Sequence, residues 1–412
     1  MADRLPVGLG RVGPTSYRAP SYNPRMRGHH RPTPLFGGLS SARFLKQHWQ
    51  KAALLVRGAI AGFSGLLSPR ELIELACNDQ VQARVIVHRR ARWDVYHGPF
   101  HTRFFRQLPT RGWTLLVQDV NHVLPAGRAL LDRFNFIPYA RLDDLMVSYA
   151  PPGGGVGPHF DSYDVFLVQG LGKRRWQISR QTDLDLIPAT PLKLLADFRV
   201  EAQWVLHPGD MLYLPPNCAH NGVAIDECMT YSIGFRAPAW RELGEAFLAY
   251  LQDNLALEGV YADPGLAPVA HPARISREMI ADTASELSRV RWREADVARF
   301  LGCYLTEPKA HVVFSPPRRA LSLHGFSRQV HRRGVRLDLK SQMLYAGTQL
   351  FLNGECEQLT GAATGPLREL ADRRTLRVSA AYPAELLEQL YRWYRAGYLQ
   401  LNNADNPAEG AR

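Results

Sequence analysis

The sequence predicts a mixed α+β protein with three successive parts. Residues 83–150 contain short runs rich in β-branched and aromatic residues, separated by Gly and Pro turns, which is typical of a β-barrel or sandwich. From about Arg241 the apolar residues recur four apart, as they do on one face of a helix. From about Glu307 strand-like runs surround an Asn353-Gly354 hairpin signal, and a small helix-plus-hairpin unit of this kind is compatible with a winged helix.

The first 39 residues form a basic stretch rich in Pro, Gly and Arg, and its composition predicts a disordered tail. The whole chain has a formal net charge of +12, and residues 1–50 contribute seven Arg and one Lys against a single acid, Asp3. Such a tail could attract RNA or a ribosome surface. It could equally be a solubilising segment, and both interpretations stay open.

Order is predicted to begin near Ser40, with a short amphipathic helix followed by an apolar strand within residues 41–60. A second helix should start at Pro69, because Ser68 can cap it and Glu71 completes a capping box. The runs that follow are expected to be strands. They are residues 83–90, 93–100, 113–120 and 142–150.

Three residues have the types and spacing of an open metal site. His159 and Asp161 follow a Gly-rich stretch and are expected to share one face of a strand. A second strand–turn unit delivers His220 about sixty residues later. Two imidazoles and one carboxylate on one face of an octahedron suit Fe(II) and leave three positions open. The alternative is an ordinary surface His and Asp, because His-x-Asp alone is a weak signal.

The usual co-substrate of such an iron site is 2-oxoglutarate, whose distal carboxylate needs a cation. In "GKRRW", alternation places Arg174 on the face of the apolar neighbours and puts Lys173 and Arg175 on a solvated face. Arg174 is therefore the candidate, since its planar fork suits a carboxylate. Ser232 and Thr230 could add a hydroxyl, or could simply line the core.

Two helical regions are predicted after the β-rich part. Leu243, Phe247, Leu251 and Leu255 give the first an apolar face, and the second lies within residues 276–305. These helices could pack on their own domain or on a second copy of the chain. An amphipathic helix is predicted near the C-terminus. Six arginines form a basic cluster in the winged-helix region, and this cluster suits either nucleic acid or a solvated face. They are Arg318, Arg319, Arg328, Arg332, Arg333 and Arg336.

Bulk properties exclude some classes of protein. No apolar run approaches the roughly 20 residues of a membrane span, and the start of the chain lacks the layout of a secretory signal. Five cysteines with no CxxC pair indicate free thiols in a reducing compartment. These features predict a cytoplasmic protein with no membrane association.

The chain resembles the bacterial ribosomal oxygenases of the JmjC group from about Ser41 to its end, more weakly after Pro238. The matching stretches are "HWQK" at His48, "HGPF" at His97, "WTLLVQDVNH" at Trp113, "DDLMVSY" at Asp143, "PGGGVGPHFDSYDVFLVQG" at Pro152, "LHPGDMLYLPP" at Leu206 and "YSIGFRAP" at Tyr231.

This resemblance implies a double-stranded β-helix (cupin/JmjC) catalytic domain at residues 40–238, a helical dimerisation region at 239–306 and a C-terminal winged-helix-like domain at 307–404, followed by a tail at 405–412. It implies a homodimer with Fe(II) held by His159, Asp161 and His220, and 2-oxoglutarate and dioxygen as co-substrates.

The same resemblance implies an activity, hydroxylation of the β-carbon of an arginine in large-subunit ribosomal protein L-sixteen. Sequence proximity adds Asp143, Asp144, Met146 and Tyr163 as candidates for binding that arginine, whereas Asp164 is expected on a turn or in a structural hydrogen bond. Three alternatives remain. In the first, the basic surface contacts ribosomal RNA instead of only water. In the second, the substrate is another basic protein or an RNA, which is hydroxylated or demethylated. In the third, the chain is a non-catalytic cupin.

Overall fold

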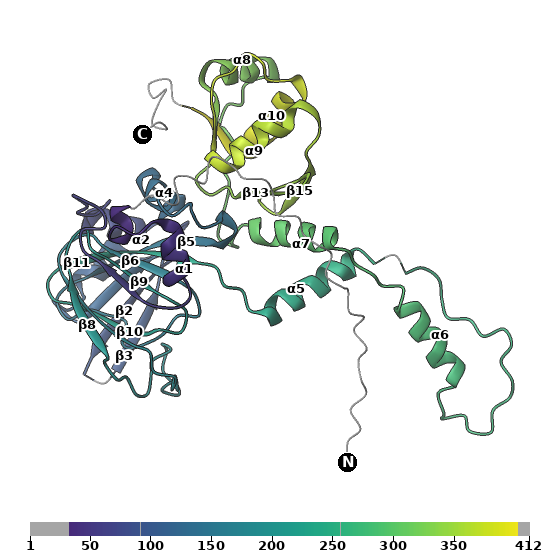
Figure 1. The fold of residues 1–412 in the computed structure, drawn as a ribbon, viewed down its shortest axis with the longest axis horizontal. Helices are drawn as coiled ribbons and strands as arrows, with labels where there is room; N and C mark the ends of the chain where they lie inside the picture. The colour runs from purple at the N-terminus through teal and green to yellow at the C-terminus, as the bar shows by residue number, and fades with distance from the viewer. Residues whose placement is uncertain (1–32, 91, 256, 403–412) are drawn as a thin grey trace.

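The computed structural model describes residues 33–402 except residues 91 and 256, and it separates into a β-rich domain, a helical arm and a C-terminal domain (Figure 1). Most of the predicted tail, residues 1–32, and the predicted C-terminal tail lie outside the described residues. Residues 33–39, which the sequence assigns to the tail, are folded. The side chain of Phe36 is 1% exposed and stacks on Phe44 with ring centroids 4.6 Å apart.

Two sheets form the catalytic domain. The larger has eight strands in the order β1-β9-β6-β11-β5-β4-β2-β3, and the smaller has the order β10-β7-β8. Their bounds are β1 Leu54–Val56, β2 Ala83–Arg89, β3 Arg92–His97, β4 Trp113–Val117, β5 Leu142–Ala150, β6 Val165–Gln169, β7 Arg174–Ser179, β8 Ala202–Leu206, β9 Met211–Leu214, β10 Ala219–Ala224 and β11 Cys228–Phe235. The strands predicted within residues 83–150 are confirmed.

Short helices cover the larger sheet. They are η2 Pro34–Phe36, α1 Ser41–Gln47, α2 Pro69–Ala76, α3 Thr102–Arg106, η3 Val120–His122, α4 Pro125–Asp132 and η4 Tyr139–Arg141. The capping box predicted for α2 is present, since the Ser68 hydroxyl accepts from the Glu71 N–H and the Glu71 carboxylate accepts from the Ser68 N–H. Side chains of α1, α2 and the sheet share one apolar core, which fixes the strands that carry the site.

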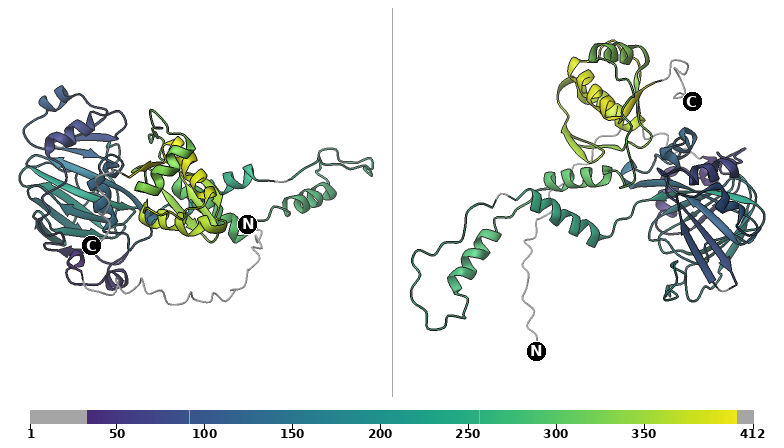
Figure 2. Two further views of the ribbon diagram at one scale, coloured as in Figure 1. Left: turned by 90° about the horizontal axis from the view of Figure 1, so that it is seen from above. Right: turned by 180° about the vertical axis from the view of Figure 1, so that it is seen from behind.

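Helices α5 (Trp240–Asp253) and α6 (Arg277–Leu287) form an arm that extends away from both domains (Figures 1 and 2). Neither helix contains a buried residue. The predicted apolar face of α5 is half-buried where Phe247 packs against Phe300 of α7 (Glu294–Thr306), with ring centroids 5.2 Å apart and the rings tilted by 60°. Leu255 lies beyond the end of α5 and is exposed.

Helix α7 packs against the C-terminal domain. Gly302 lies so close to the ring of Phe351 that a Cβ there would be 2.3 Å from it. The sequence predicts a domain boundary at residue 307. In the structure α7 lies before that boundary but packs on the domain that follows it. The other elements of this domain are α8 Leu323–Arg333, β12 Val335–Leu337, β13 Met343–Ala346, β14 Gln349–Leu352, β15 Glu355–Gln358, η5 Gly361–Ala363, α9 Thr364–Arg373, β16 Thr375–Leu376, α10 Ala384–Ala396 and β17 Leu399–Leu401.

The hairpin and terminal helix predicted for this domain are confirmed. Leu352 pairs with Glu355 across the turn, and Asn353 and Gly354 both have the positive φ, 52° and 91°, that a two-residue hairpin turn of this type requires. Helix α10 buries one face, including Leu386, Leu390 and Trp393.

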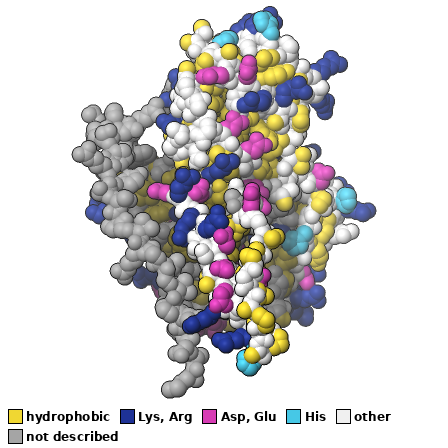
Figure 3. Space-filling view, turned by 90° about the vertical axis from the view of Figure 1, so that its right-hand side faces the viewer, with side chains coloured by type: hydrophobic (Ala, Val, Ile, Leu, Met, Phe, Trp, Pro, Cys, Tyr) yellow, Lys and Arg dark blue, Asp and Glu magenta, His cyan; other side chains and the backbone are white. Residues whose placement is uncertain are grey.

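The six arginines of the basic cluster are all exposed. Figure 3 shows Lys and Arg side chains gathered on the upper part of the molecule, over the C-terminal domain. The five cysteines are free thiols. Among the described residues, no helix has the length and apolar character needed to cross a bilayer.

Candidate metal centre

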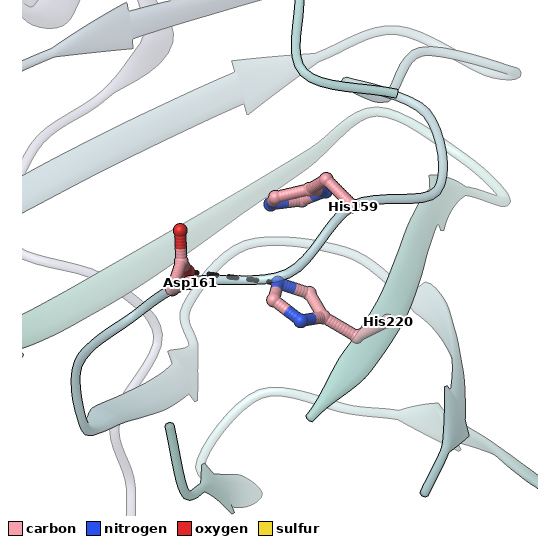
Figure 4. Close-up of side chains that lie close together, drawn as sticks. All are labelled: His159, Asp161 and His220. Carbon is pink, nitrogen blue, oxygen red and sulfur yellow. Dashed lines mark ion pairs between the residues drawn. The ribbon is translucent and has the colours of Figure 1, made fainter. Parts of the chain in front are cut away.

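His159, Asp161 and His220 lie close together, and their side chains point toward one another (Figure 4). Each residue offers a ligand atom that lies within 4.8 Å of the ligand atoms of the other two. The His220 Nε2 and Asp161 Oδ2 atoms are 3.8 Å apart. This is the grouping that the sequence predicts, and within the described residues it is the only cluster of its kind.

The expectation that His159 and Asp161 share a strand is wrong. Both precede β6, which begins at Val165, and His159 belongs only to an isolated β-bridge with His220 on β10. In that bridge the backbone N–H of each histidine donates to the carbonyl of the other, at 3.0 and 2.8 Å. The backbone of β10 thus positions the loop ligand, and a continuous strand through His159 and Asp161 is not needed.

The glycines before the motif allow this loop to pass close to two strands. A Cβ at Gly154 would lie 2.1 Å from the carbonyl oxygen of Trp113, and one at Gly155 would lie 2.5 Å from that of Gly222. Any side chain at either position would therefore displace the loop, and this confirms the close backbone approach expected of the Gly-rich stretch.

Both imidazoles are oriented for metal binding. The Nδ1 of His159 is 2.9 Å from the carbonyl oxygen of Gly157, and the Nδ1 of His220 is 2.9 Å from that of Cys218. A carbonyl oxygen only accepts, so each Nδ1 carries the proton and each Nε2 has a free lone pair. Burial, and after it the imidazole of His159, lower the pKa of His220 to about 4, which keeps that ring neutral as a ligand must be.

A cavity of about 420 Å³ opens from the three ligands. Arg174 lies on its wall with only 4% of its surface exposed, while Lys173 and Arg175 are exposed, as alternation along β7 predicts. The Nε and Nη2 atoms of Arg174 are buried, and no described residue forms a hydrogen bond with either. A buried guanidinium without an acceptor is costly, so the cavity is suited to a small anion such as a carboxylate.

Two regions of the chain match known protein families. Residues 129–243 match the JmjC domain, and residues 289–400 match the ROXA-like winged helix. The chain is 35% identical over 281 residues to the ribosomal protein uL16 3-hydroxylase of Escherichia coli, a match that covers 66% of this chain and 73% of that protein. The family is thereby decided. The chain belongs to the JmjC ribosomal oxygenases.

Other relatives of this oxygenase are similar over different shares of their length. A probable ribosomal oxygenase of Haemophilus influenzae is 39% identical over 227 residues, which is 54% of each chain. The X-ray structure of E. coli YcfD superposes with a TM-score of 0.79 at 31% identity, covering 88% of this chain and 98% of that one. A structure of YcfD in complex with cobalt and 2-oxoglutarate has a TM-score of 0.76 at 30% identity, covering 89% and 99%.

The hydroxyls expected beside Arg174 also line the oxygenase's cavity. Ser232 on β11 is directly opposite Met146 on β5, and it is 6% exposed. The Thr230 hydroxyl donates to the side-chain oxygen of Gln169 at 3.0 Å. Thr230 therefore has a structural partner, whereas the Ser232 hydroxyl has no hydrogen-bond partner among the described residues, which leaves Ser232 as the stronger candidate for a ligand.

The predicted substrate residues form another wall of the same cavity. Asp143, Asp144, Met146 and Tyr163 all line it. Burial, and after it the carboxylate of Asp143, raise the pKa of Asp144 to about 7. Burial, and after it the carboxylate of Asp161, also raise the pKa of the Tyr163 phenol. The wall thus combines a buried carboxylate with apolar and aromatic surface.

Asp164 is separate from this cavity and has the structural role that the sequence predicts. It is fully buried, and its carboxylate accepts from the Tyr213 hydroxyl at 2.6 Å and from the Gln50 side-chain amide at 3.0 Å.

Sequence reasoning missed several residues around the cavity. Arg84, Gln118 and Lys193 line it, and they come from β2, the segment after β4 and a long loop. Lys309, which contacts Asp143 beside the cavity, comes from beyond α7. None of these positions carries a local motif, so only the fold brings them together.

Proposed function

We propose that this oxygenase uses Fe(II), 2-oxoglutarate and dioxygen to hydroxylate the β-carbon of an arginine in large-subunit ribosomal protein uL16, the L-sixteen of older nomenclature. One observation carries the chemistry: three ligands and a buried, unpaired Arg174 guanidinium face the same cavity. The E. coli relative's name, ribosomal protein uL16 3-hydroxylase, supports the substrate.

His159, Asp161 and His220 would hold Fe(II) on one face and leave its other positions open for co-substrates. When bound, Fe(II) and 2-oxoglutarate supply the oxidising power to insert one oxygen atom into a C–H bond. Arg174 would bind the distal carboxylate of 2-oxoglutarate, and Ser232 would donate its hydroxyl to the same group. The Nδ1 contacts keep the two imidazoles in the tautomer that binds metal.

Asp144, Met146 and Tyr163 would hold the target arginine. A guanidinium near Asp144 would meet a carboxylate that burial otherwise leaves poorly solvated, and the apolar stem of the arginine would lie on Met146 and the ring of Tyr163. Arg174 and Asp144 line one cavity with opposite charges, so a carboxylate co-substrate and a cationic substrate are each attracted to a different wall.

The arm supports a homodimer as the working unit. Leu248 is 66% exposed and Ile280 is 57% exposed, and such apolar surface marks an interface. A second copy of the arm would cover this surface by symmetry.

Contact with ribosomal RNA is the function we assign to the basic cluster on α8 and the segments flanking it. Residues 308–337 include its six arginines and no Asp or Glu. Exposed guanidinium groups pair well with phosphates. A substrate inside the large ribosomal subunit would place both this contact and the enzyme in the cytoplasm.

The uL16 assignment can be tested with purified enzyme, Fe(II), 2-oxoglutarate, ascorbate and the host's own uL16 fragment, followed by tandem mass spectrometry. We expect one added oxygen on a single arginine, absent with His159→Ala and retained with His101→Ala, which changes an exposed histidine outside the cavity. Oxygen on another basic protein, on RNA, or loss of a methyl group would replace the substrate and keep the oxygenase.

A non-catalytic cupin is the remaining alternative. It would follow if the wild-type protein bound neither Fe(II) nor 2-oxoglutarate in calorimetric titration. The intact set of three ligands and Arg174 argues against it.

A further inference from the structure

A small ion cluster adjoins the wall of the cavity that carries Asp144. Its cation is Lys309, from the segment that connects α7 to the C-terminal domain. The Lys309 Nζ atom lies 2.8 Å from Asp119 Oδ1 and 3.2 Å from Asp143 Oδ1. One lysine therefore joins two carboxylates of the catalytic domain, and Asp143 is the chain neighbour of Asp144.

Asp119 transmits this contact to the cavity. It is 5% exposed and has a left-handed backbone, with φ 53° and ψ 32°, which is uncommon for a residue with a side chain. Its backbone N–H donates to Asp144 Oδ2 at 3.1 Å. Lys309 binds the side chain of Asp119, and the backbone N–H of Asp119 binds Asp144. An ion pair that holds Asp119 in place therefore also holds the N–H group that donates to Asp144.

The charges facing Asp144 come from four segments. Asp143 is on β5, Asp119 precedes η3, Tyr163 precedes β6, and Lys309 comes from the connecting segment. Lys309 is the cation among these groups. It lowers the pKa of Asp144, whereas burial and the carboxylates of Asp143 and Asp119 raise it. Three further groups contact the cluster. The His122 Nδ1 atom is 3.9 Å from Asp119 Oδ1. The Arg236 Nε atom is 3.6 Å from Asp143 Oδ1, and the His311 Nε2 atom is 3.2 Å from Asp119 Oδ2.

We propose that Lys309 is a positioning residue for substrate binding, which holds Asp144 in place and in its charged form to receive a cationic side chain. The inference rests on the proposed function, because it takes Asp144 as the group that meets the substrate arginine. Burial disfavours the ammonium of Lys309, but the carboxylates of Asp144, Asp143 and Asp119 outweigh it and raise its pKa. Lys309 thus stays charged throughout the neutral pH range in which the enzyme would meet its substrate.

The proposal connects the C-terminal domain to the catalytic cavity. Arg236, just after β11, donates from Nη1 to the carbonyl of Leu305 in α7 at 2.7 Å, close to where the Lys309 segment begins. The Lys309 ion pairs and this hydrogen bond therefore join the catalytic domain to two neighbouring parts of the chain, the segment after α7 and α7 itself. The contacts of Asp144 thus include one of the links between the catalytic and C-terminal domains.

The test compares full-length wild type with Lys309→Met, Lys309→Arg and Lys46→Met, the last being an exposed lysine on α1. The first measurement is kcat and KM for the uL16 fragment between pH 6 and 9. Lys309→Met should raise the KM for the fragment about tenfold near pH 7, and it should shift the acidic limb of kcat/KM to higher pH by about one unit. The KM for 2-oxoglutarate should not change in Lys309→Met. Lys309→Arg should keep most of the wild-type affinity for the fragment and most of the wild-type pH profile, and Lys46→Met should match wild type.

A purely structural role would look different. It would lower the melting temperature and reduce kcat at every pH, leave the acidic limb where it is, and show no rescue by arginine. That outcome overturns the proposal.

A second measurement does not need the substrate. Carboxyl-¹³C aspartate NMR, with Asp144→Asn for assignment, should show Asp144 titrating at a higher pH in Lys309→Met. An unchanged Asp144 titration contradicts the proposal whatever the substrate proves to be. A shifted titration with no oxygen added to uL16 would support the role of Lys309 and overturn only the proposed substrate.

Discussion

Strand β11 of the catalytic domain buries all eight of its residues, whereas helix α5 of the arm, fourteen residues long, buries none. Both segments are rich in apolar side chains. The catalytic domain buries its apolar side chains within one chain, while the arm leaves Trp240 88% and Leu248 66% exposed. The catalytic domain therefore needs only its own chain for this burial, whereas the arm keeps an apolar surface that the proposed second copy would cover.

Truncation of a barrel residue should produce the largest loss of stability. Leu145 on β5 is 0% exposed, so Leu145→Ala should lower the free energy of unfolding of the catalytic domain by about 2–5 kcal/mol. The matched change Leu248→Ala in the arm should stay within about 0.5 kcal/mol. Urea unfolding followed by tryptophan fluorescence measures both, and equal losses would mean that the arm is part of the same cooperative unit.

Charges placed on the arm should act on association and not on folding. The pair Leu248→Asp and Ile280→Asp should convert a dimer to a monomer at micromolar concentration, because two buried carboxylates would face apolar surface. Light scattering coupled to size exclusion gives the mass, and circular dichroism should show an unchanged fold. A persistent dimer would exclude this face of the arm as the interface.

Two substitutions on β7 should show that 2-oxoglutarate binding depends on the buried arginine of this strand and not on its exposed neighbour. Arg174→Ala should weaken 2-oxoglutarate binding about 10- to 100-fold, since hydrogen bonds to charged groups are worth about 1.5–3 kcal/mol. Arg175→Ala, its exposed neighbour, should leave binding unchanged. Calorimetric titration with an inert divalent metal measures the affinity without turnover, and the reverse result would move the role to Arg175.

The smallest expected effect is a pH dependence of stability that arises at His122. Burial lowers the pKa of His122 from 6.5 to about 4, so the folded state keeps this ring neutral while the unfolded state takes up a proton. Stability is therefore complete above pH 6.5 and is lost as the pH falls from 6.5 towards 4. Between pH 6.5 and 5 the loss should be about 1–2 kcal/mol, and His122→Gln should remove it from the unfolding curve. An identical pH slope in the variant would contradict the assignment.

The sequence predicted the site better than it predicted how the site is built. His159, Asp161, His220 and Arg174 are brought together as expected, because chemistry restricts which residue types can hold Fe(II) and a carboxylate. The strand through His159 and Asp161 is absent, since the backbone partner that fixes His159 is His220, sixty-one residues along the chain. No local pattern reports such a contact.

Long-range partners account for the other omissions. Lys309 lies on a connecting segment without periodicity, and its contact with Asp119 spans 190 residues. Phe36 was assigned to a tail because its neighbours include Pro and Gly, yet its ring is buried in the core, and Leu35 and Leu39 pack against that core beside it. Composition averages over a window and cannot detect a few anchoring side chains.

The bridge between His159 and His220 has a consequence for metal exchange. Because main-chain hydrogen bonds set the spacing of these two ligands, the empty and loaded proteins should have nearly the same shape, and binding should require little loss of conformational entropy. A rigid open triad of this kind discriminates weakly among divalent ions of similar size, so the ion that occupies it depends on which metals are available to the cell as well as on affinity. The cobalt in the YcfD complex fits this view.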